Sequence, residues 1–153
     1  MRNLMNKKLI GVTLCSCLLP LCFSAAAQQP KTFRIGFLAA GPRASVTSRI
    51  EAFRAGLREL GYVEGKNLVI EERYGDARIE RVPELAAELV RLKVHVIVTG
   101  GSQATGPAKK ATSTIPIVMA QDNDPVGSGF VASLAQPGGN ITGLANLNSE
   151  LSG

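Results

Sequence analysis

Apolar residues between positions 33 and 144 fall into short runs separated by small or polar residues. Runs of about four to eight residues, bounded by glycine, proline or polar residues, are typical of strands. The run at 94–98 is rich in β-branched residues and fits a central parallel strand that is covered on both faces. The predicted strands are 33–38, 67–74, 94–98 and 115–119, followed by a short extended piece at 141–144.

A helical pattern follows the first predicted strand. From Val46 the apolar residues recur at alternating spacings of four and three, which predicts one buried helix face. Either Ser45 or Thr47 is expected to cap the start of this helix, and Gly61 is expected to end it. The apolar face comprises Val46, Ile50, Phe53, Leu57 and Leu60.

Three more helices complete the predicted order. The second covers about 80–92, and Pro83 fits only in its first turn, where a missing donor costs little. The third follows the turn at 99–102 and ends near Thr112, and a short fourth covers about 127–134. Alternating strands and helices of this length predict a parallel sheet with right-handed crossovers. The expected fold class is α/β, a doubly wound parallel sheet of flavodoxin-like order 2-1-3-4, with any fifth strand at the edge.

The first 27 residues form a different kind of segment. A short basic stretch at 1–8 precedes the almost uncharged run 9–23 and the small residues that end at Ala27. This order is typical of a secretory signal peptide, and the apolar run is too short to cross a bilayer. We expect cleavage after Ala27 and a periplasmic location. A lipid anchor at Cys22 is the alternative, but the bulky Leu21 before it fits such signals poorly.

Composition changes once this leader is set aside. All three cysteines lie inside it, so the mature domain has no disulfide and no thiol for catalysis or metal binding. The formal charge falls from +5 to +2, because Arg2, Lys7 and Lys8 lie in the leader. The remaining basic residues alternate with acidic ones and form no stripe, so we expect no nucleic-acid partner.

Ligands of doubly wound sheets bind beyond the carboxyl ends of the strands, next to the point where strand order reverses. Here that rim comprises 39–43, 100–105 and 120–124. The turn at 100–102 permits close backbone approach, and a helix amino end there would suit an anionic group. The alternative is an ordinary turn with a serine cap. Pro107 complicates this turn, since a proline inside the helix removes a hydrogen bond, and the helix could instead start at Thr105.

Candidates for catalysis are few. Asp122 and Asp124 are two carboxylates on one loop that could act as acid and base or hold a cation, but capping or ligand hydrogen bonding fits them better. His95, the sole histidine, is expected at the end of its strand that faces away from the rim. Because the phosphate-loop, nucleophile-elbow and metal-spacing motifs are missing, we expect no enzyme, no metal and no cofactor.

Several motifs together resemble one family. The segments 111–118 (ATSTIPIV), 124–127 (DPVG) and 136–143 (QPGGNITG) closely resemble the ABC-transporter substrate-binding family related to tryptophan- and tyrosine-binding proteins. The segments 53–62 (FRAGLRELGY) and 65–67 (GKN) are similar to that family's first helix and turn. The resemblance covers essentially all of residues 32 to 153.

The resemblance implies a type I periplasmic-binding architecture, in which two doubly wound lobes close over a small solute. It implies that the protein binds an amino acid or similar small organic solute and delivers it to an ABC permease in the inner membrane. The loops of the rim would then form the first-lobe half of the cleft. The candidate ligand-binding residues are Ala40, Gly41, Gly101, Ser102, Gln103, Gln121, Asp122, Asn123 and Asp124.

In that family a segment similar to 146–153 leads into the second lobe. We therefore expect a signal peptide at 1–27, an N-terminal lobe at 28–145 and the truncated start of a hinge segment at 146–153. A lobe without its partner would bind solute weakly. Two alternatives remain open: a single-lobe sensory or scaffolding protein with a membrane partner, and a secreted flavodoxin-like enzyme that uses Asp122 or Asp124.

Overall fold

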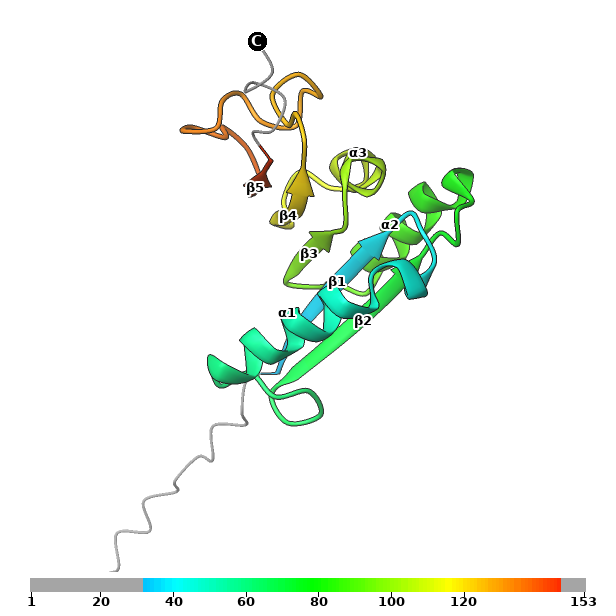
Figure 1. The fold of residues 1–153 in the computed structure, drawn as a ribbon, viewed down its shortest axis with the longest axis vertical. Helices are drawn as coiled ribbons and strands as arrows, with labels where there is room; N and C mark the ends of the chain where they lie inside the picture. The colour runs from blue at the N-terminus through cyan, green and yellow to red at the C-terminus, as the bar shows by residue number, and fades with distance from the viewer. Residues whose placement is uncertain (1–31, 147–153) are drawn as a thin grey trace, which may run out of the picture.

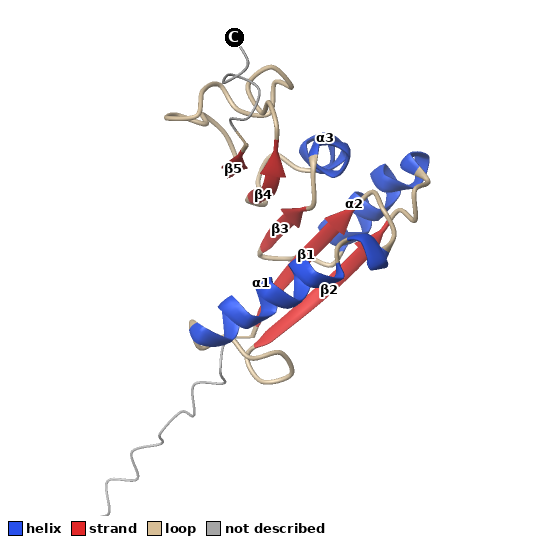
Figure 2. Ribbon diagram, viewed as in Figure 1, coloured by secondary structure: helices blue, strands red, loops and turns tan. Residues whose placement is uncertain are grey.

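The computed structural model describes residues 32–146 of the chain, so the predicted leader and the segment 147–153 lie outside the described residues. Strands alternate with helices from residue 33 to residue 122, and the last strand follows without a helix before it (Figures 1 and 2). The strands are β1 (Phe33–Ala39), β2 (Leu68–Tyr74), β3 (Val96–Thr99), β4 (Ile117–Asp122) and β5 (Ile141–Ala145). The helices are α1 (Thr47–Glu59), α2 (Val82–Arg91) and α3 (Ser102–Ala111), with short 3-10 helices at Arg43–Ser45 and Ile79–Arg81.

The five strands form one sheet in the order β2-β1-β3-β4-β5. Every neighbouring pair is parallel, from Phe33 opposite Leu68 in β1 and β2 to Ile117 opposite Ile141 in β4 and β5. The predicted order, with the fifth strand at the edge, is confirmed.

Two buried clusters lie on opposite faces of the sheet. Leu38 and Ile97 pack with α2 and α3 on one face, whereas Phe37 and Val98, their neighbours along β1 and β3, pack with Ile50 of α1 on the other. Since successive side chains of a strand point to opposite faces, the helices cover both sides of the sheet. The doubly wound α/β class is therefore confirmed.

Helix α1 shows where periodicity misleads. Its predicted face is correct at Ile50, which is 1% exposed, but Leu60 is 74% exposed because the helix ends one residue before it. Gly61 ends the helix as predicted, with a φ of +85° and its amide bonded to the carbonyl of Arg58. No side chain caps the start of α1, which a 3-10 helix precedes.

The two predicted caps of α1 are wrong for one shared reason. The Ser45 hydroxyl donates to the carbonyl of Pro42 at 2.7 Å, and the Thr47 hydroxyl donates to the carbonyl of Arg43 at 3.0 Å. Both hydroxyls therefore bond backward to the 3-10 turn instead of accepting from the amides of the helix.

Helix α3 begins at Ser102, so a start at Thr105 is wrong, and Pro107 lies inside the helix. The first turns of the helix are anchored to the sheet. Thr105 is fully buried, and its hydroxyl shares a hydrogen bond of 2.8 Å with the hydroxyl of Thr99 at the end of β3. By contrast, Pro83 lies in the first turn of α2, as predicted.

The predicted helix at 127–134 does not form. The side chain of Asp124 accepts from the amide of Gly127 at 2.7 Å, and the amides of Phe130 and Val131 both donate to the carbonyl of Pro125. Gly129 adopts a φ of +67°, outside the helical region. The segment 127–134 therefore forms turns, although its apolar pattern predicted a short helix.

None of the helices between residues 32 and 146 combines the length and the hydrophobicity that a bilayer crossing requires.

A cluster of charged side chains joins α1 to the edge strand β2. Glu72 pairs with Arg54 of α1, accepts a hydrogen bond from the hydroxyl of Tyr74, and lies 3.6 Å from the Nε of Arg43. Burial raises the pKa of Glu72, but the hydrogen bonds from Tyr74 and Arg54 outweigh it, so that the pKa lies below its ordinary value. Burial, together with the bond to Glu72, raises the pKa of Tyr74 to about 12.

Glu72→Gln is expected to lower the free energy of unfolding by about 1–2 kcal/mol at neutral pH, because the substitution replaces charge-assisted hydrogen bonds. A carboxylate whose folded pKa is depressed stabilises the fold above its unfolded value of 4.5, and this contribution is lost as pH falls through the folded pKa. The unfolding energies of wild type and variant should therefore converge in acid. Urea unfolding across the acidic range measures this, with the exposed Glu59→Gln as the control. Curves that stay parallel down to about pH 3 would contradict the assignment.

Candidate functional site

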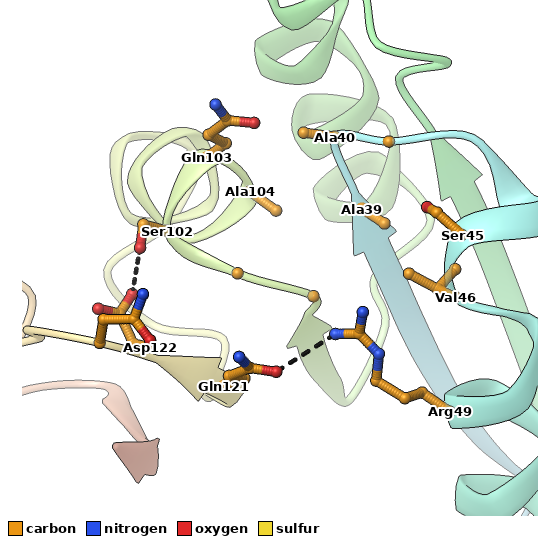
Figure 3. A pocket seen from close by; sticks show the side chains of 14 residues that line it. Ala39, Ala40, Ser45, Val46, Arg49, Ser102, Gln103, Ala104, Gln121 and Asp122 are labelled. Carbon is orange, nitrogen blue, oxygen red and sulfur yellow. Dashed lines mark hydrogen bonds between the residues drawn. The ribbon is translucent and has the colours of Figure 1, made fainter. Parts of the chain in front are cut away.

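A cavity of about 290 Å³ opens at the carboxyl ends of β1, β3 and β4 (Figure 3). Its walls come from the chain that follows each of these strands and from the start of α1. The chain leaves β1 toward α1 on one face of the sheet and leaves β3 toward α3 on the other. A crevice forms between the segments that follow β1 and β3, at the point where strand order reverses.

Eight of the nine candidate residues line this cavity, and Asp124 does not. They come from three segments that are far apart in the sequence but adjacent at the ends of parallel strands. That these residues bind a solute stays a prediction. The eight are Ala40, Gly41, Gly101, Ser102, Gln103, Gln121, Asp122 and Asn123.

The turn between β3 and α3 brings backbone amides to the cavity. Gly101 has a φ of +138°, which disfavours any other residue, and a Cβ at Gly100 would lie 3.4 Å from that of Ala39. Ala104 and Thr105 donate their amides back to the carbonyl of Gly101. The amides of Ser102 and Gln103 have no backbone acceptor within the described range, and they carry the positive end of the helix dipole.

Asp122 holds this turn in place from β4. Its carboxylate is 2% exposed, and one oxygen accepts from the hydroxyl of Ser102 at 2.7 Å (Figure 3). The other oxygen accepts from the amide of Asp124 at 3.0 Å. Because both oxygens are engaged, Asp122 acts as an internal cap. This favours the structural interpretation of the two carboxylates over acid-base chemistry.

Asp124 and His95 lie away from the cavity. Asp124 caps the turn at Gly127. The Nδ1 of His95 accepts from the amide of Arg34 at 3.0 Å, at the amino end of the sheet, and its ring lies 5.7 Å from that of Phe33. His95 is therefore at the end opposite the cavity, as predicted. Within residues 32–146 no three His, Cys, Asp or Glu side chains are placed to hold a metal ion.

One wall of the cavity lies outside the rim predicted from the sequence. Ser45, Val46 and Arg49 line it from the start of α1. The guanidinium of Arg49 reaches toward β4 and donates to the Oε1 of Gln121 at 3.4 Å (Figure 3). The sequence could have predicted this wall, because the helix after the first strand begins at the same rim as the loop that precedes it.

A parallel sheet of this order, with a crevice across its strand ends, defines a lobe of the type I periplasmic-binding class. A model of the ABC transporter substrate binding protein family matches residues 42–151, and the chain belongs to this family. The family is one of solute-binding proteins and not of enzymes.

Individual relatives agree with this assignment. A tyrosine-binding protein of Clostridioides difficile is 31% identical over 99 residues, which are 65% of this chain and 29% of that protein. A conserved domain protein of Vibrio cholerae has a TM-score of 0.73 at 30% identity, over 79% of this chain and 43% of that one. The ABC domain of Streptococcus pneumoniae in complex with L-Trp has a TM-score of 0.70 at 27% identity, over 75% of this chain and 39% of that one. The chain thus spans less than half the length of each of these relatives.

Proposed function

We propose that this protein is the extracytoplasmic solute-binding component of an ABC importer, and that its solute is an amino acid or a similar small organic molecule. One observation carries the proposal: a chain of the substrate-binding family gathers eight predicted ligand-binding residues around one crevice at its strand ends. The tyrosine-binding protein and the L-Trp complex among its relatives support an amino acid as the solute.

The proposal includes the partners and the location of such a component. The leader at 1–27 would direct export to the periplasm, and the solute would pass to a permease in the inner membrane. Residues 28–145 would serve as the first lobe, contributing one side of a cleft that a second lobe closes. Binding sites of this kind bury about 70–90% of their ligand.

A single lobe should bind its solute weakly. If half of a micromolar binding energy is kept, the dissociation constant is about millimolar. We therefore expect L-tyrosine, L-tryptophan or another amino acid to shift the backbone amide signals of Ser102, Gln103 and Asn123 in a nuclear magnetic resonance titration at millimolar concentration.

A matched pair of variants localises this binding. Gln103→Trp places a bulky ring at the cavity and should abolish the shifts, whereas Lys110→Trp lies outside the cavity lining on the same helix and should preserve them. If a panel of amino acids and small organic acids, bases and amides leaves these signals unchanged, the proposed function is wrong.

A further inference from the structure

The cavity is lined by two charged residues, and solute can reach the charge of one of them. Asp122 is 2% exposed, and both of its oxygens accept hydrogen bonds from the protein. Arg49 is exposed and extends its guanidinium across the crevice from α1 (Figure 3). Among the described residues that line the cavity, Arg49 is therefore the charged group whose hydrogen-bond donors remain open to a solute.

The guanidinium of Arg49 lacks the partner that many arginines of this lobe have. Arg34, Arg43, Arg54, Arg73 and Arg81 each pair with at least one carboxylate. Among residues 32–146 no carboxylate lies within ion-pair distance of Arg49, and its one hydrogen bond is to the neutral amide of Gln121 at 3.4 Å. A guanidinium has five donors, so most of those of Arg49 have no acceptor among residues 32–146.

We propose that Arg49 is a specificity-determining residue that binds a carboxylate of the solute, so that this lobe selects anionic solutes over neutral analogues of the same shape. The inference rests on the proposed function and names the substrate class of the same site. Gln121 holds the guanidinium over the crevice in the absence of solute. A carboxylate then replaces a long bond to a neutral amide with shorter, charge-assisted bonds in a fork geometry.

The opposite wall of the crevice also offers hydrogen-bond donors. The amides of Ser102 and Gln103 point from the amino end of α3, where the helix dipole favours negative charge. The hydroxyl of Ser102 donates a hydrogen bond to Asp122, and the buried carboxylate of Asp122 offsets part of this dipole. An anionic solute can therefore bond to donors on both walls, and the charge of Arg49 favours it over a neutral amide of equal size.

Succinate and its neutral diamide, succinamide, are suitable probes, because they share a carbon skeleton and differ in charge. In a titration of the full chain we expect succinate to shift the side-chain Nε signal of Arg49 and the amide signals of Ser102 and Gln103, with succinamide at least about tenfold weaker. Arg49→Gln should weaken succinate binding by about tenfold or more, and Arg49→Lys by less, since it keeps the charge and loses the fork.

The matched control is Arg58→Gln. Arg58 is on the same helix, roughly 14 Å further along its axis, and does not line the cavity. This variant should bind succinate as the wild type does. Equal shifts from succinate and succinamide, no shift from succinate, or an Arg49→Gln variant with unchanged affinity would each overturn the proposal.

The outcome separates this inference from the proposed function. An amino acid that binds Arg49→Gln and the wild type equally well leaves the solute-binding function standing and removes Arg49 from recognition. Conversely, a chain that responds neither to succinate nor to any other solute of the panel contradicts the proposed function itself, whereas a chain that responds to other solutes but not to succinate contradicts the carboxylate site alone.

Discussion

Asp122→Ala is expected to lower the free energy of unfolding by about 3 kcal/mol and the melting temperature by about 10 °C. The carboxylate is almost fully buried and accepts from the hydroxyl of Ser102 and the amide of Asp124. Its removal leaves both donors without their acceptor and opens a void at the end of β4, since the surrounding backbone collapses only in part. Urea unfolding and a thermal scan measure the effect.

Two variants control for charge and position. Asp124→Ala removes a carboxylate from the same segment but leaves the buried site intact, and it should cost about 1 kcal/mol or less. Asp122→Asn keeps the volume but turns an amide toward one of the two donors. Its loss of unfolding free energy should therefore lie between those of Asp122→Ala and Asp124→Ala. If Asp122→Ala is as stable as Asp124→Ala, Asp122 does not hold the turn.

Gly143→Ala is expected to cost about 3 kcal/mol or more, without changing any residue of the two cores. Gly143 has a φ of +149°, and an added Cβ would lie 2.6 Å from the backbone nitrogen of Met119 in the neighbouring strand. Because the obstacle is backbone on the paired strand, β5 must move away from β4 to admit a methyl group.

The expected damage is local as well as global. Hydrogen exchange should accelerate at the paired amides of β5 more than in β1 or β3. Gly139→Ala provides the comparison, because no atom lies within 4 Å of its added Cβ, and its stability should stay within about 0.5 kcal/mol of wild type. Equal unfolding energies for the two variants would refute the steric explanation.

The sheet was predictable because its strands carry short apolar runs, bounded by small or polar residues. The run 94–98 is central, between β1 and β4, as its β-branched composition indicates. Helix ends were harder. Leu60 continues the apolar period of α1, but Gly61 takes a left-handed conformation, so the chain turns before Leu60 can reach the sheet.

The rim of the site was predictable from topology alone, since parallel strands place their carboxyl ends together. The roles within it were not. Asp122 and Asp124 are equivalent in sequence, yet one is buried against Ser102 and the other caps an outer turn. Asp122 is the last residue of β4, whereas Asp124 lies in the loop beyond the strand. Arg49 was missed because its relation to Gln121 spans 72 positions of sequence.

The order of strands in the sheet also limits the order in which the lobe can assemble. β1 is the first strand of the described residues but lies inside the sheet, between β2 and β3, which both follow later. During synthesis the apolar β1 therefore stays unpaired until at least β2 has left the ribosome. Among the described strands, β5 pairs only with β4. Pairings between segments distant in sequence are slow to form, so the early strands depend on later synthesis for their protection from aggregation.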